Sequence, residues 1–71
     1  MKKYLIVIEQ TDGGYSGYSP DLPGCVSTGK TREETECNMR EAIQFHIDGL
    51  KLEGYPVPEA QASSSYVELP T

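Results

Sequence analysis

The clearest structural signal in this chain lies in residues 4–19, which read YLIVIEQTDGGYSGYS. Apolar and β-branched residues alternate along the first half and predict a strand over residues 2–10. Asp12, Gly13 and Gly14 follow, and such residues supply the positive φ angles of a tight hairpin turn. A second strand is therefore expected over residues 15–19. Because both faces of the first strand are apolar, we expect it to be central, with its second face covered as well.

Working outward, further elements follow in the order strand, helix, strand. Two prolines and Gly24 predict a rigid turn before a short strand over residues 25–28. Thr31 and Glu34 form a capping-box pattern, and Gly54 is a typical C-terminal stop, so a helix is expected over about 32–53. The last strand is expected over residues 65–69. The chain is thus predicted to be one α+β domain, residues 1–71, with two layers, a right-handed crossover and sheet order 3-2-1-4.

Charge and size restrict the class of partner. The 71 residues contain eleven acidic and six basic side chains, a net charge of −5. Direct nucleic-acid binding is not expected, because it depends on clustered basic side chains; an acidic domain suits a basic protein surface. A chain this small buries a limited fraction of its surface when it folds, so its stability is expected to be low. We therefore expect it to gain stability as a homodimer or a higher homo-oligomer.

The expected location is the cytoplasm. Residues 4–8 form an apolar run too short to span a membrane, and no signal-peptide cleavage pattern follows it. Two cysteines are too few for the disulfide framework of a secreted miniprotein, so both thiols are expected to be reduced.

No residue pattern indicates catalysis, a cofactor or a metal. His46 lies within the apolar stripe of the expected helix, and Cys25 follows a turn, so both are interpreted as structural residues. One histidine and two cysteines do not supply a zinc site. The acidic residues are spread over a helix face, strand ends and turns; a residual hydrolase using Glu9 and Asp21 is the least favoured alternative.

Six short motifs occur in a characteristic order, and together they resemble the HicB-like antitoxin family of bacterial and archaeal toxin–antitoxin modules. The resemblance runs from about Lys3 to Pro58. In chain order the motifs are Gly13–Tyr15, Ser19–Cys25, Gly29–Thr31, Glu33–Glu34, Glu41–Ile43 and Gly54–Pro58.

This resemblance implies a degenerate ribonuclease-H-like fold of order β-β-β-α-β. It also implies a partner, a small basic HicA-type toxin that cleaves mRNA, which the antitoxin would block by steric and electrostatic occlusion without catalysis. Many family members add a C-terminal DNA-binding segment. The sequence up to Thr71 contains no such segment. We therefore do not expect this chain to bind operator DNA, and we expect the short form of the family, without the DNA-binding segment.

The partner surface is expected to use aromatic side chains and the proline-rich turn, with acidic residues at the rim. Its expected members are Tyr15, Tyr18, Pro20, Asp21, Leu22, Pro23, Gly24 and Cys25. The competing interpretation is that one of the two tyrosines is packed in the core as a strand residue and does not contact the partner. The alternative function is a stand-alone oligomeric regulatory module without a toxin partner.

Overall fold

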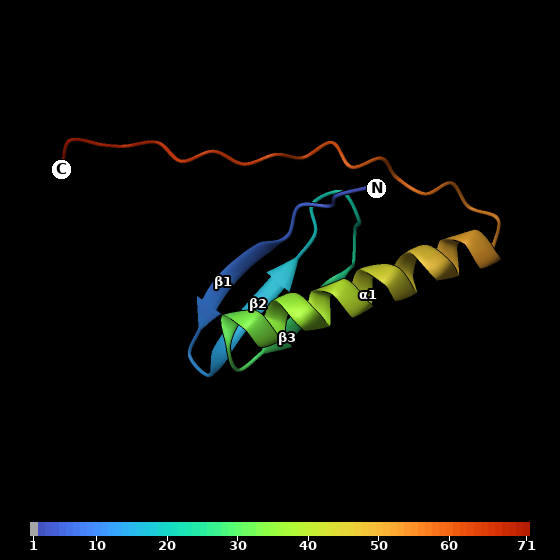
Figure 1. Ribbon diagram of the computed structural model, residues 1–71, viewed down its shortest axis with the longest axis horizontal. Helices are drawn as coiled ribbons and strands as arrows, with labels where there is room; N and C mark the ends of the chain where they lie inside the picture. Colours follow the sequence, from blue (N-terminus) through green and yellow to red (C-terminus); the bar gives the residue numbers. More distant parts are fainter. Residues whose placement is uncertain (1) are drawn as a thin grey trace.

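The computed structural model describes residues 2–71 and shows a three-stranded antiparallel sheet with one helix packed on it (Figure 1). Strand β1 (Val7–Thr11) pairs with β2 (Gly14–Tyr18), which pairs with β3 (Val26–Gly29). Helix α1 (Arg32–Leu52) follows. The predicted α+β class is confirmed, and residue 1 of the expected domain lies outside the described residues.

Strand β1 begins later than the strand expected over residues 2–10. Its partner β2 ends at Tyr18, and the chain then turns away at Ser19, so residues 2–6 have no partner on that side. The Ser19 hydroxyl instead donates to the Leu5 carbonyl at 3.0 Å. The N-terminal segment is therefore held beside the sheet without extending its ladder.

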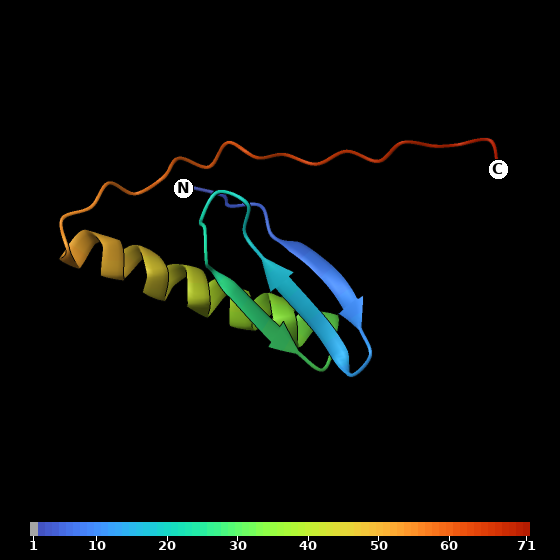
Figure 2. The ribbon, with the colours of Figure 1, turned by 180° about the vertical axis from the view of Figure 1, so that it is seen from behind.

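Helix α1 covers one face of the sheet, and Figure 2 shows the opposite face with no element over it. Leu22, Cys25 and Met39 form the buried apolar core between the layers, and Tyr4, Ile6, Ala42 and Ile43 pack around it. The close approach of the layers depends on Gly17 in the middle of β2. A Cβ atom there would lie 3.0 Å from the Met39 Cγ and 3.2 Å from the Thr35 Cγ2.

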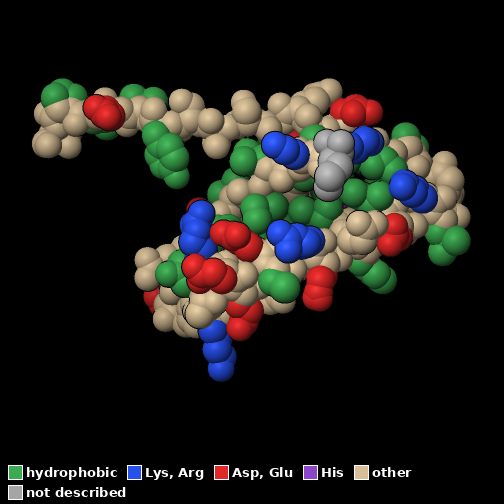
Figure 3. Space-filling model, viewed as in Figure 1, with side chains coloured by type: hydrophobic (Ala, Val, Ile, Leu, Met, Phe, Trp, Pro, Cys, Tyr) green, Lys and Arg blue, Asp and Glu red, His purple; other side chains and the backbone are tan. Residues whose placement is uncertain are grey.

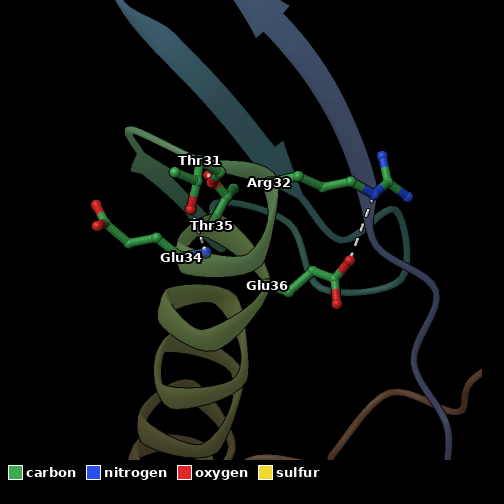
Figure 4. A network of polar contacts seen from close by, with 5 residues as sticks. All are labelled: Thr31, Arg32, Glu34, Thr35 and Glu36. Atoms are coloured by element: carbon green, nitrogen blue, oxygen red, sulfur yellow. Dashed lines mark hydrogen bonds and ion pairs between the residues drawn. The ribbon is translucent and has the colours of Figure 1, made fainter.

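Local hydrogen bonds mark both ends of α1. The Thr31 hydroxyl accepts from the Glu34 amide at 3.0 Å, as the capping pattern predicts (Figure 4). The Glu34 carboxylate accepts from the Lys30 amide at 3.0 Å, one residue before the position that a standard capping box uses. At the other end Gly54 has φ of +76°, and the Tyr55 amide donates to the Leu50 carbonyl at 2.9 Å. The helix therefore ends in a Schellman arrangement.

The C-terminal segment differs from the expectation. Residues 65–69 form no strand, and the described sheet has the order β1-β2-β3, without the fourth strand of the predicted order 3-2-1-4. Residues 55–71 run from the end of α1 back across the domain and project beyond it (Figure 1). The alternating pattern of residues 65–69 is a local property, whereas a strand also needs a backbone partner, and the segment meets none in this structure.

Candidate functional site

The face of the sheet that α1 leaves open carries a row of apolar side chains. Val7 pairs with Tyr18, and Tyr18 pairs with Val26, so one residue from each strand lies in this row. Their side chains point away from the helix, because the neighbouring Gly17 faces Met39 and side chains alternate along a strand. Val7, Tyr18 and Val26 are named the open-face row below.

The open-face row is accessible to a partner. Tyr18 is 40% exposed and Val26 is 64% exposed, whereas Val7 is partly buried. Glu9, Ser16 and Thr28 form the next row on the same face, in register with one another. The face thus offers an apolar strip beside a polar and acidic one, the arrangement that protein interfaces use at their core and rim.

Tyr15 and Tyr18 do not lie together, although both were predicted to bind the partner. They are three residues apart in one strand, so their side chains point to opposite faces. Tyr15 is partly buried on the helix side, in register with Gly29. Only Tyr18 contributes to the open face, and the interpretation of one tyrosine as a packed strand residue fits Tyr15.

The turn over residues 19–25 divides into an inner and an outer set. Leu22 and Cys25 are buried in the core, so their side chains are not available to a partner in this structure. The Leu22 amide donates to the Ser19 carbonyl, and the Cys25 amide donates to the Leu22 carbonyl, both at 3.1 Å. Pro20, Pro23 and Gly24 remain on the exposed side.

Asp21 has a structural contact. Its Oδ2 atom accepts hydrogen bonds from the backbone amides of Gln61 at 3.1 Å and Ala62 at 3.0 Å. The carboxylate therefore fastens the C-terminal segment to the turn. This contact could not be predicted from the sequence, because it joins residues 40 and 41 positions apart.

The structure places the candidate reactive residues Cys25, Glu9 and Asp21 in three different surroundings. Burial raises the pKa of the Cys25 thiol, which disfavours the thiolate that a nucleophile needs. Glu9 is exposed on β1, whereas Asp21 is engaged by the C-terminal segment. Within residues 2–71, no group of three or more histidine, cysteine, aspartate or glutamate side chains could hold a metal ion. The same part of the chain contains no helix with the length and apolar character needed to cross a membrane.

The open-face row includes two residues that the predicted site lacked, Val7 and Val26. A signal for Val7 was present, because apolar residues on both faces of the first strand indicate a second covered surface. Val26 lies in a strand too short to show which face it uses. Its position follows from the register with Tyr18.

Comparison with known proteins places this geometry in a family. Residues 4–71 match the family described as HicB_like antitoxin of bacterial toxin-antitoxin system. The chain belongs to this family. A chain in a solved structure described as a HicA3 and HicB3 toxin-antitoxin complex is 42% identical, with a TM-score of 0.69; the match covers 78% of the HicB-like chain and 64% of that chain.

Relatives of the HicB-like chain occur in a phage, an archaeon and a cyanobacterium. A protein from the rep-hol intergenic region of Haemophilus phage HP1 is 39% identical over 67 residues, which is 94% of this chain and 50% of the phage protein. A UPF0150 protein of Thermoplasma acidophilum is 39% identical over 62 residues, 87% of this chain and 90% of the relative. A UPF0150 protein of Synechocystis is 44% identical over 57 residues, 79% of this chain and 72% of the relative. The HicB-like chain thus spans half the length of the phage protein.

Proposed function

We propose that this domain is an antitoxin that binds a HicA-type toxin through the open face of its sheet and neutralises it by covering the toxin's surface. The observation that carries this proposal is the open-face row, an apolar strip that no element of the described chain covers. The family and the similarity to a chain of a HicA3–HicB3 complex support the class of partner.

Charge supports the same partner. The net charge of −5 attracts a basic, RNA-handling protein and raises the rate of encounter. Tyr18 supplies a partly exposed aromatic ring of the kind that often contributes strongly to binding. Pro20, Pro23 and Gly24 extend the exposed surface from the end of β2. In this proposal the domain acts in the cytoplasm, without a cofactor or catalysis, and does not bind nucleic acid directly.

The fold proposed for the functional state is a degenerate ribonuclease-H-like sheet of order 3-2-1-4. Its fourth position is the free edge of β1, and residues 65–69 carry the alternating pattern of the strand that would occupy it. An unpaired edge favours such an addition, because its backbone amides and carbonyls have no ladder partner.

Copurification tests the proposed function. The tagged domain is expressed together with the small basic protein encoded next to it, and the complex is isolated by affinity and size-exclusion chromatography. We expect a stable complex and loss of the partner's RNA cleavage when the domain is present in excess. If that neighbour is not toxic alone and does not copurify, the antitoxin function is wrong and the stand-alone oligomeric module becomes the better description.

A further inference from the structure

A groove lies on the helix side of the domain, between α1 and the N-terminal segment that leads into β1. It has a volume of about 600 Å³, and its apolar wall is formed by Tyr4, Ile6, Ile43, Ile47 and Val57. Figure 3 shows hydrophobic side chains gathered in this hollow, between the helix and the C-terminal segment. The open-face row is on the other side of the sheet, so the groove is a separate surface.

The position of α1 explains why the groove is on this flank. The Asn38 side-chain amide donates to the Thr28 carbonyl at 2.8 Å, which ties the helix to β3. The opposite flank of α1, which carries Ile43 and Ile47, faces Tyr4 and Ile6 across the groove. The groove thus lies beside the segment that leads into β1, the strand that forms one edge of the sheet.

The rim of the groove is basic, although the chain as a whole is acidic. Lys2, Arg40 and Lys51 line it, which is half of the six basic residues in the sequence. Glu36 is the one carboxylate in the lining, and it pairs with Arg32 outside the groove at 3.5 Å (Figure 4). A basic toxin would be repelled here, so the groove suits an occupant that is apolar and negatively charged.

The chain itself contains a segment with this chemistry. Tyr66, Val67 and Leu69 are 99%, 79% and 71% exposed, and they lie in an extended stretch that pairs with no strand among the described residues. In a strand, Val67 and Leu69 share one face, and Glu68 points to the other. The segment can therefore place two aliphatic side chains in the groove, and Glu68 gives the segment a negative charge on its opposite face.

Contacts of the same chain direct this segment away from its own groove. The Tyr4 hydroxyl donates to the Pro58 carbonyl at 2.7 Å, and Asp21 holds the amides of Gln61 and Ala62. Residues beyond Ala62 then leave the domain (Figure 1). To return to its own groove, the chain would have to reverse direction within residues 63–65. A second copy can deliver the segment with all three hydrogen bonds intact.

We propose that residues 66–69 of a second copy occupy the groove, so that two chains exchange their C-terminal segments in a symmetric dimer. Each copy then gives one segment and receives one, as two-fold symmetry requires. The exchange covers the apolar residues that stand exposed in the single chain and places each segment beside the residues that lead into β1. It involves the helix side only and does not depend on the toxin.

Engineered cysteines test the exchange directly. Cys37 is exposed and is first replaced by serine, whereas the buried Cys25 is kept. Ile47→Cys and Val67→Cys are introduced into separate preparations, which are mixed, allowed to exchange and mildly oxidised. We expect a covalent dimer on a non-reducing gel. In the matched control, the variant Val26→Cys, which places the thiol on the open face, is used in place of Ile47→Cys. We expect no covalent dimer in this control.

The double variant Ile47→Cys/Val67→Cys distinguishes exchange from folding back. If dilution leaves a disulfide within one chain, seen as a fast-migrating monomer that reduction reverses, the segment fills its own groove and the exchange is wrong. If neither the mixed single variants nor the double variant forms a disulfide, the C-terminal segment does not bind in the groove. Light scattering gives an independent readout: the intact chain should have the mass of two copies, and the variant Val67→Asp/Leu69→Asp the mass of one. An intact chain with the mass of one copy contradicts the proposal, whether or not it binds a toxin.

Discussion

Gly17 lies directly beneath Met39, so close that a methyl group on Gly17 would come within 3.0 Å of the Met39 Cγ. This contact sets the distance between β2 and α1. A glycine in the middle of a strand weakens the strand itself, and here the close packing of the two layers offsets that cost. A glycine within a strand marks either a bulge or a close backbone approach. The continuous pairing of Gly17 with Ile8 and Ser27 excludes a bulge, and the short distance to Met39 shows the close approach.

The substitution Gly17→Val should lower the free energy of unfolding by about 1–3 kcal/mol, since overpacking displaces side chains and backbone. Valine is favoured in strands, so its intrinsic preference cannot explain a loss. Urea titration followed by circular dichroism gives the measurement. Gly49→Ala is the control, because nothing lies within 4 Å of a Cβ atom there, and it should raise stability by about 0.5–1 kcal/mol. Equal stability of Gly17→Val and the unaltered chain would contradict the assigned packing.

The cap of α1 offers a second stability test. Thr31→Ala removes the hydroxyl that accepts from the Glu34 amide, and should lower the free energy of unfolding by about 1 kcal/mol. Thr31→Ser keeps the acceptor and should restore most of the difference. Thermal unfolding of the two variants side by side checks this. If serine is no better than alanine, the hydroxyl bond does not stabilise the helix.

The two cysteines should differ strongly in reactivity. Cys37 is exposed on α1, whereas Cys25 is buried and its pKa is raised by that burial. Because the thiolate is the reacting form, a disulfide reagent at neutral pH should modify one thiol per chain rapidly and the second only after denaturant is added. Mass spectrometry should place the rapid modification on Cys37. Modification of Cys25 at a similar rate under native conditions would show that the turn opens readily.

Asp21 should control the C-terminal segment more than the stability of the domain. Asp21→Ala removes the acceptor for the amides of Gln61 and Ala62, so hydrogen exchange at these amides should become faster. Asp21→Asn keeps a carbonyl oxygen and should protect them partly. Asp48→Ala, which removes an exposed carboxylate on α1, serves as the control and should leave their exchange unchanged. Unaltered exchange in Asp21→Ala would mean that this contact does not hold the segment.

Toxin binding should depend on the open-face row. Val26→Asp puts a charge in the middle of an apolar interface, and we expect at least about a tenfold loss of affinity, or about 1.4 kcal/mol. Tyr18→Ala should act in the same direction. Phe45→Asp is the matched control, because Phe45 is exposed on the outer side of α1 and takes no part in the row. Calorimetry with the copurified toxin supplies the affinities; full affinity in Val26→Asp would place the interface elsewhere.

Much of the fold could be predicted from local patterns. The hairpin at Asp12–Gly13 and the capped helix from Thr31 to Gly54 depend on residues close together in sequence, and both are present. The strand expected over residues 65–69 is absent, because its pattern gives a preference while the partner depends on the path of the chain. That path is set in part by the contact between Asp21 and Ala62, for which no local pattern exists.

The candidate surface was less predictable than the fold. The spacing of Tyr15 and Tyr18 already implies opposite faces of one strand, so their separation could have been predicted. The inward direction of Leu22 and Cys25 could not, because an irregular turn has no periodicity that assigns side chains to a face. Val26 was missed since its role depends on its register with Tyr18, which only the assembled sheet determines.

Helix α1 covers only one side of the sheet, and this arrangement has a consequence for how such domains diverge. Substitutions in the open-face row can follow changes in a toxin, while the groove and the C-terminal segment behind it stay constant. With the two proposed surfaces on opposite sides, selection for a new specificity need not disturb the pairing of the copies. Two-layer domains of this kind can thereby evolve antitoxins that each bind one toxin and not the toxins of related modules. All of them can still keep the same fold.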